Sequence, residues 1–163
     1  MYVKFARKSF GHFTRLGGLT RIVDIQLGLK WDDRQRALSN RWGFKCTCSL
    51  CSASDKQIRK SDARRDRINE LRDLALDQVN KQKYRKSLNH HLEIVKLVKE
   101  EGLFSHLGES YWVMARLYSA LQDRRNTIKY AQMAHAELSR YRESGDDMNE
   151  TVQELEEFLA GIK

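Results

Sequence analysis

Proline is absent from this sequence of 163 residues, although its average use in proteins, about 5%, would give roughly eight. Because proline breaks helices and favours turns, its absence argues against a loop-rich β protein and suits long helices joined by short turns. The sequence also lacks an apolar run near the roughly 20 residues that a membrane-spanning helix needs, and its start lacks the pattern of a secretory signal. We therefore expect an intracellular protein, in the nucleus, the cytoplasm or both, with no membrane partner.

Acidic residues are too few to balance the charge in the first half of the chain. Residues 1–80 hold 17 Lys and Arg against 9 Asp and Glu, whereas residues 81–163 hold 13 of each, so the net charge of +8 lies in the first half. The basic stretch 56–72 has acidic residues interleaved at helical spacing, which favours a solvated helix face. It lacks the interleaved aromatic residues on which bases stack, so we do not expect a nucleic-acid partner, and a basic nucleic-acid-associated protein is the lesser alternative.

The chain divides into three parts by pattern. Residues 1–31 form a poorly defined segment in which residues 19–25 are β-branched enough for a short strand. Residues 32–54 predict a short helix, capped by Asp32 or Asp33, and then an irregular loop that holds every cysteine. Residues 55–163 predict a helical domain.

Apolar residues recur at helical spacing through the third part. Ser61 is the predicted N-cap of the first helix, Gly102 would stop the second, and Gly161 would follow the last. The predicted helices cover about residues 62–80, 84–101, 109–121, 124–142 and 147–160. The fold class is therefore mostly α, with antiparallel helical hairpins.

The helices from 109 to 142 carry a pattern typical of tetratricopeptide repeats. Bulky and aromatic residues alternate with small ones that allow two helices to approach closely, namely Tyr111, Met114, Ala115, Tyr118, Ala131 and Ala134. An ordinary antiparallel bundle uses alanine in the same way. We predict a tetratricopeptide-like superhelix and regard the aromatic stripe as core in either case.

All three cysteines fall within six residues, as Cys46, Cys48 and Cys51 in a C-x-C-x-x-C cluster. This spacing allows three thiolates to converge on one Zn²⁺, which takes four ligands in structural sites. A disulfide framework is the poorer interpretation, because the count is odd and the rings would be small. The histidines His90, His91, His106 and His135 lack ligand spacing to the cluster, and His12 is the weak candidate for a fourth ligand. We expect weak or dimer-shared zinc binding.

The run from Arg34 to Cys51, RQRALSNRWGFKCTCSLC, resembles the end of a SET domain and its post-SET zinc segment. It is most similar to protein lysine methyltransferases of the SET-and-MYND type and their fungal relatives, in which a helical domain with tetratricopeptide-like helices follows. The resemblance implies that Cys46, Cys48 and Cys51 are zinc ligands. It also places Phe44 near the adenine of S-adenosylmethionine, although an ordinary core phenylalanine is the favoured interpretation.

The sequence departs from that family where catalysis would occur. The family's G-x-G cofactor loop and its N-H-x-C segment, which holds the fourth zinc ligand, do not occur. Ile22 stands where the catalytic tyrosine is expected, or the tyrosine is deleted. An isoleucine has no polar atom to align a lysine amine with a methyl donor. The resemblance therefore implies no catalytic residue here.

We accordingly expect a C-terminal fragment or degenerate member of a SET-domain histone or protein lysine methyltransferase, a SET/post-SET remnant joined to a helical domain and inactive alone. A histone or other lysine substrate, and S-adenosylmethionine, belong to an intact family member. The alternative is a helical adaptor that binds a protein or peptide partner through residues 55–163.

Overall fold

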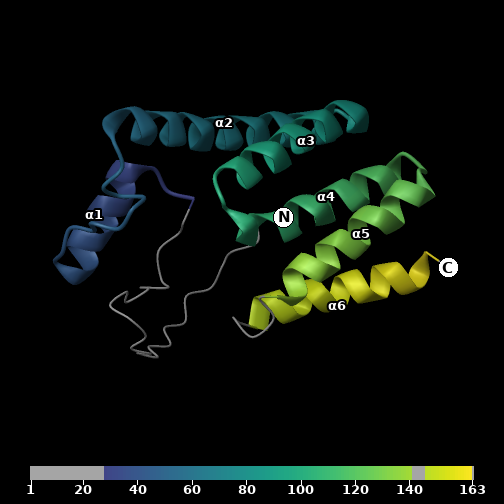
Figure 1. Cartoon of the computed structure of the whole chain (residues 1–163). Helices are drawn as coiled ribbons and strands as arrows, with labels where there is room; N and C mark the ends of the chain where they lie inside the picture. The colour runs from purple at the N-terminus through teal and green to yellow at the C-terminus, as the bar shows by residue number, and fades with distance from the viewer. Residues whose placement is uncertain (1–27, 141–145, 163) are drawn as a thin grey trace. The chain divides into compact units, whose positions relative to one another are not determined.

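The structure, a computed structural model, describes residues 28–140 and 146–162. Regular structure in these ranges is helical, with no strand among them, which confirms the mostly α fold (Figure 1). None of the helices found there is both long and apolar enough to cross a membrane. The predicted strand at 19–25, with Ile22, and the candidate ligand His12 lie outside the described residues. The elements are α1 (Trp31–Trp42), α2 (Asp55–Asn80), α3 (Tyr84–Glu100), the 3₁₀ turn η1 (Phe104–His106), α4 (Leu107–Ala120), α5 (Arg124–Ser139) and α6 (Asp146–Gly161).

The chain forms two compact units, residues 1–62 and 63–163, and the division falls inside α2. In the first unit, α1 follows Lys30 and not the predicted caps Asp32 and Asp33. These two carboxylates lie in the first turn, where they complement the positive end of the helix dipole. The helix ends at Gly43, whose φ of 69° is a left-handed value that glycine adopts without strain.

The start of α2 corrects the prediction that Ser61 is its N-cap. Ser54 and Gln57 form a capping box: the Gln57 side chain accepts from the Ser54 N–H at 3.0 Å, and Ser54 Oγ accepts from the Gln57 N–H at 3.4 Å. The helix therefore begins at Asp55, well before Asp62, and Ser61 is buried within it.

The connections in the second unit repeat one turn at a constant interval along the chain. Gln82, Gly102 and Gln122 each follow a helix with left-handed φ values of 56°, 67° and 58°. After α2, the Gln82 and Lys83 N–H groups donate to Val79 and Gln78 carbonyls at 2.8 Å each. The same pair of bonds recurs around Gly102 and around Gln122, at 2.9–3.1 Å. This pair of hydrogen bonds satisfies carbonyl groups at the helix end. The turn reverses the chain, so successive helices run antiparallel.

The core of the second unit is apolar and continuous from α2 to α6. Ala115, Ala131 and Ala134 are fully buried between α4 and α5, as their small size predicts. Gly108 lies so close to Leu138 that an added Cβ would come within 2.6 Å of the leucine side chain. Small residues at this interface therefore set the spacing of the two helices.

The helix ends differ modestly from the predicted ones. The structure starts α4 at Leu107 and not at Glu109, ends α5 at Ser139, and includes Gly161 in α6. Gly102 terminates the α3 region as predicted. The stretch from the turn at 82 to the turn at 122 encloses one hairpin and is longer than a tetratricopeptide repeat, which has roughly 34 residues. A tetratricopeptide-like arrangement stays a prediction.

Candidate metal centre

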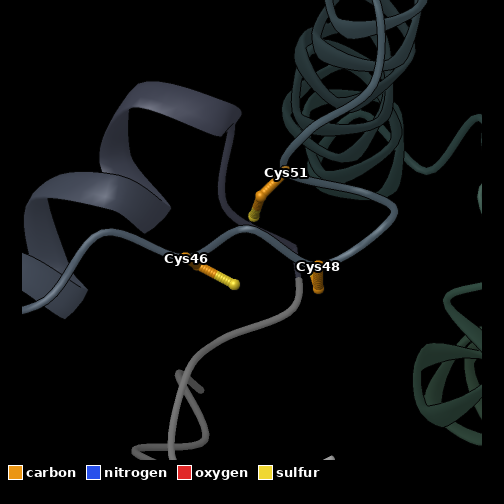
Figure 2. A group of neighbouring side chains, drawn as sticks. All are labelled: Cys46, Cys48 and Cys51. Atoms are coloured by element: carbon orange, nitrogen blue, oxygen red, sulfur yellow. The ribbon is translucent and has the colours of Figure 1, made fainter.

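The three cysteines lie on the loop between α1 and α2, and Figure 2 shows them together there. Cys51 is buried, while Cys46 and Cys48 are partly exposed. The Sγ atoms all lie within 4.8 Å of one another. The sequence prediction that these three side chains converge is therefore confirmed.

Gln35 on α1 holds the first cysteine in place. Its side-chain amide donates to the Cys46 carbonyl and accepts from the Cys46 N–H, both at 3.0 Å. A glutamine side chain thereby pairs with the peptide as a neighbouring β-strand would, and it satisfies both polar groups of that residue's backbone. The start of the cysteine loop is fixed to the helix by these two hydrogen bonds.

Trp31 holds the last cysteine of the cluster. Its indole Nε1 donates to the Cys51 carbonyl at 2.8 Å, and its backbone N–H donates to the Asp62 carboxylate at 2.9 Å. The side chain and the backbone of one residue thus connect the start of α1 to the loop and to α2. Both ends of the cysteine cluster are anchored to the same short helix.

Cys48 and Cys51 are joined by a tight turn. The Cys51 N–H donates to the Cys48 carbonyl at 2.9 Å, and the Ser52 N–H and hydroxyl donate to the same oxygen at 2.8 Å each. A hydrogen bond from residue i+3 to residue i is typical of a β-turn, whose end Cα atoms lie within about 7 Å of each other. The turn keeps the backbone of the second and third cysteines close together.

The two thiols of this turn have pKa values shifted in opposite directions. Burial raises the pKa of Cys51 to about 11, and hydrogen bonds to the other thiols add to the effect. Burial also acts to raise the pKa of Cys48, but hydrogen bonds from the Cys51 and Leu50 backbone and from the neighbouring thiols outweigh it and hold that pKa below the ordinary value.

The cluster fits part of a structural zinc site. Two thiolates on a tetrahedral Zn²⁺ with Zn–S bonds of about 2.3 Å lie roughly 3.8 Å apart, so the three sulfurs need to close by about 1 Å at most. Among the residues that the structure describes, no fourth histidine, cysteine or carboxylate joins the group. The described cluster therefore offers three of the four donors that a structural zinc site takes.

Apolar side chains lie exposed beside the cluster. Phe44 is 37% exposed, so it is not the core residue that the favoured interpretation assumed. Trp42 and Leu50 are exposed to a similar extent, 38% and 41%. The position of Phe44 near a bound S-adenosylmethionine stays a prediction.

Comparison with known proteins gives one partial relative. The chain is 41% identical over 51 residues to "Histone-lysine N-methyltransferase set5" of Schizosaccharomyces pombe. The match covers 31% of this chain and 15% of that protein. No protein-family model and no solved structure matches the chain. The match and the three cysteines together fit a post-SET-like region. The short match gives loose support to a SET-related origin of the chain.

The cysteines were predictable because their spacing alone indicates a metal site, but Gln35 and Trp31 were not. Both act through the backbone of the loop, and no spacing rule links a helical glutamine to a peptide so much later in the chain. The available signal was that these two residues stand about one turn apart on a short helix directly before a cysteine cluster.

Proposed function

We propose that Cys46, Cys48 and Cys51 form a post-SET-type zinc site in a segment of a SET-related protein lysine methyltransferase. The observation that carries the proposal is the convergence of the three Sγ atoms on a loop anchored at both ends. The partial match to a histone-lysine N-methyltransferase supports it. Because a metal takes up the thiolates only when they converge, the anchors lower the ordering cost of binding.

The site would fix the loop and hold Phe44 toward a methyltransferase cofactor site. Methyl transfer in the family uses the G-x-G and N-H-x-C segments, and neither occurs in this sequence. We therefore propose that the chain contributes a structural element and does not transfer methyl groups by itself. S-adenosylmethionine and a histone or other lysine substrate belong to the complete enzyme.

Metal analysis of the full chain, purified without chelator, tests the zinc site. We expect about one zinc per chain, or about one per two chains if a second copy shares the metal. Cys48→Ser should lose most of the zinc, whereas Ser49→Ala, a neighbour in the same turn, should keep it. Wild-type protein without zinc, or zinc that persists in the Cys48→Ser variant, would contradict the proposal.

A methyltransfer assay tests the lack of independent activity. The chain is incubated with labelled S-adenosylmethionine and histone or non-histone substrates. We expect no turnover above that of a Cys46→Ser/Cys48→Ser/Cys51→Ser control. Turnover that only the wild-type chain shows would overturn this part of the proposal and leave the zinc site unaffected.

A second candidate function, a helical adaptor, is favoured by apolar side chains exposed on the second unit. Leu76, Leu92 and Phe104 are 50%, 46% and 52% exposed. Exposed apolar side chains of this size suit contact with a protein partner. Binding partners captured by the full chain should be lost in a Leu76→Ser/Leu92→Ser variant and kept in a Cys48→Ser variant.

A further inference from the structure

The turn from Cys48 to Cys51 has the geometry of a disulfide-forming pair. A hydrogen bond of 2.9 Å closes the turn, and the two Sγ atoms lie within 4.8 Å of each other. Cα atoms at the ends of such a turn are less than about 7 Å apart, and disulfides span about 4.4–6.8 Å between Cα atoms. The two ranges overlap, so a turn of this kind is compatible with a disulfide between its end residues.

Exposure differs between the two sulfurs in a way that suits a two-step oxidation. Cys48 is partly exposed, so a dissolved oxidant reaches it, while Cys51 is buried and only 8% exposed. A thiol that reacts first with a small oxidant and a second thiol that then closes the disulfide are the parts of a reversible thiol switch. The two residues stand in that order here.

We propose that a hydroperoxide oxidises Cys48 and Cys51 to an intramolecular disulfide. The Cys48 thiolate attacks the terminal oxygen of the hydroperoxide, the O–O bond breaks, and the proton lost by the Cys48 thiol goes to the leaving oxygen, which gives a sulfenic acid on Cys48 and water or an alcohol. The Cys51 sulfur then attacks the Cys48 sulfur, the S–O bond breaks, and the hydroxyl leaves as water with the proton of the Cys51 thiol. In sum two thiols and one hydroperoxide give one disulfide, one water and one further water or alcohol, and the hydroperoxide is the species reduced.

Cys46 is the thiol that remains. Its N–H and carbonyl are both held by the Gln35 side chain, so its backbone is fixed to α1 and not to the turn. The structure gives no hydrogen-bonded turn between Cys46 and either of the other cysteines in the described loop. The turn therefore favours the pair Cys48–Cys51 over the two pairs that include Cys46.

The disulfide and the metal exclude each other, a consequence that rests on the proposed zinc site. A disulfide removes two of the three thiolates, and one remaining sulfur does not retain a structural zinc ion. Oxidation would release the metal, and zinc would protect the thiols. The cluster then acts as a redox-modification site as well as a structural one.

The test uses the full chain, once after zinc loading and once after chelator treatment, with hydrogen peroxide as the oxidant. Free thiols are counted, and the remaining one is alkylated. Cleavage after Lys45 and Lys56 leaves all three cysteines on peptide 46–56, so fragmentation of that peptide locates the alkyl group. We expect the chelated chain to fall from three thiols to one, a mass loss of two hydrogens before alkylation, and alkylation at Cys46.

Matched variants separate the possible outcomes. Cys46→Ser should still form the disulfide, whereas Cys48→Ser and Cys51→Ser should not. Alkylation at Cys48 or Cys51, disulfides between chains, or over-oxidised single cysteines would overturn the proposal. Failure of the zinc site appears separately, as lack of metal in the zinc-loaded sample, because the disulfide in the chelated sample does not depend on zinc.

Discussion

A single buried imidazole shows how the second unit constrains its ionisable residues. His91 on α3 has an Nδ1 atom that is buried without a hydrogen-bond partner. Burial, with the nearby charges of Arg72 and His90, lowers the pKa of His91 to about 4. Burial, together with Arg72 and Arg65, also lowers the pKa of His106. The fold therefore keeps both imidazoles neutral at a pH where the unfolded chain would protonate them.

This burial predicts a loss of stability in mild acid. Above pH 6.5 the folded and unfolded chains both hold neutral His91, and below that pH only the unfolded chain takes up the proton, until the folded pKa of about 4 is reached. From pH 7.5 to pH 5 the free energy of unfolding should fall by about 2 kcal/mol through this residue. Urea unfolding at pH 7.5 and at pH 5 measures this fall in the free energy of unfolding.

The control for this prediction is His135, whose side chain is 38% exposed. His91→Leu should reduce the pH-dependent loss, while His135→Gln should leave it nearly unchanged, whatever either variant does to stability at pH 7.5. An unaltered pH dependence in His91→Leu would show that His91 is not held neutral by the fold.

At the scale of the elements, the repeated turn makes glutamine adopt a conformation that glycine prefers. Gln122 has a φ of 58° and is exposed, and a left-handed residue with a Cβ costs about 1–2 kcal/mol. Glycine removes that cost but gains freedom in the unfolded chain, so Gln122→Gly should raise the free energy of unfolding by roughly 0.5–1 kcal/mol. Chemical denaturation measures the change.

A glutamine-to-glycine substitution inside a helix should change the free energy of unfolding in the opposite direction. Gln153 lies in α6, where glycine costs about 1 kcal/mol relative to a good helix former. Gln153→Gly should therefore destabilise the chain while Gln122→Gly stabilises it. Two destabilised variants would mean that the turn after α4 is not left-handed in solution.

The contact of α4 with α5 predicts a cost for one added methyl group. In Gly108→Ala the new Cβ would meet the Leu138 side chain at 2.6 Å, and Leu138 is 1% exposed, so it has little room to move. Overpacking of this kind costs typically about 1–3 kcal/mol. Thermal unfolding should show a lower midpoint for this variant.

Gly161→Ala is the matched control, because a Cβ at Gly161 meets nothing within 4 Å. It should leave the midpoint nearly unchanged. Equal effects of the two alanine variants would contradict the close approach of α4 to Leu138.

The helices were predictable from the sequence, but their ends and joints were not. Apolar residues at helical spacing indicated all five helices of residues 55–163, because that spacing follows directly from helix geometry. The start of α2 was misplaced because Ser61 was preferred to the capping pair Ser54 and Gln57. The turns at Gln82 and Gln122 were missed because glutamine has no special tendency toward left-handed backbone.

The candidate site also has a part that could be predicted from the sequence and a part that could not. The choice of the three cysteines as candidate ligands follows from residue type and spacing, which are local properties of the sequence. The contacts of Gln35 and Trp31 depend on how α1 folds back against the loop, which is a tertiary property. The three converging thiols could therefore be predicted from the sequence, whereas the residues that hold their loop could not.

At the scale of the whole molecule, the two compact units predict separate responses to metal. The described cysteine cluster lies in residues 1–62, whereas the continuous apolar core lies in residues 63–163. A ligand that binds the folded state at about 100 times its dissociation constant stabilises by about 2.7 kcal/mol. Zinc should therefore raise the stability of the first unit only.

Tryptophan fluorescence and circular dichroism can follow the unfolding of the two units separately. Fluorescence of Trp31 and Trp42 should report the first unit, in a Trp112→Phe background that removes the tryptophan of the second. Circular dichroism at high temperature should report the larger helical unit. Chelator should lower the fluorescence midpoint and leave the helical midpoint unchanged; equal shifts of both would show that the units unfold together.

The spacing of the turns has a consequence for how such a chain can change in length. Because the left-handed residues stand at 82, 102 and 122 with the same hydrogen bonds, the joints are interchangeable. Excising residues 83–122 would connect the joint after α2 directly to α5 and leave a complete hairpin, and duplicating the same block would add one. Loss of that whole block therefore leaves one such joint between α2 and α5, and its gain adds two, whereas an insertion or deletion with an end inside a helix breaks that helix.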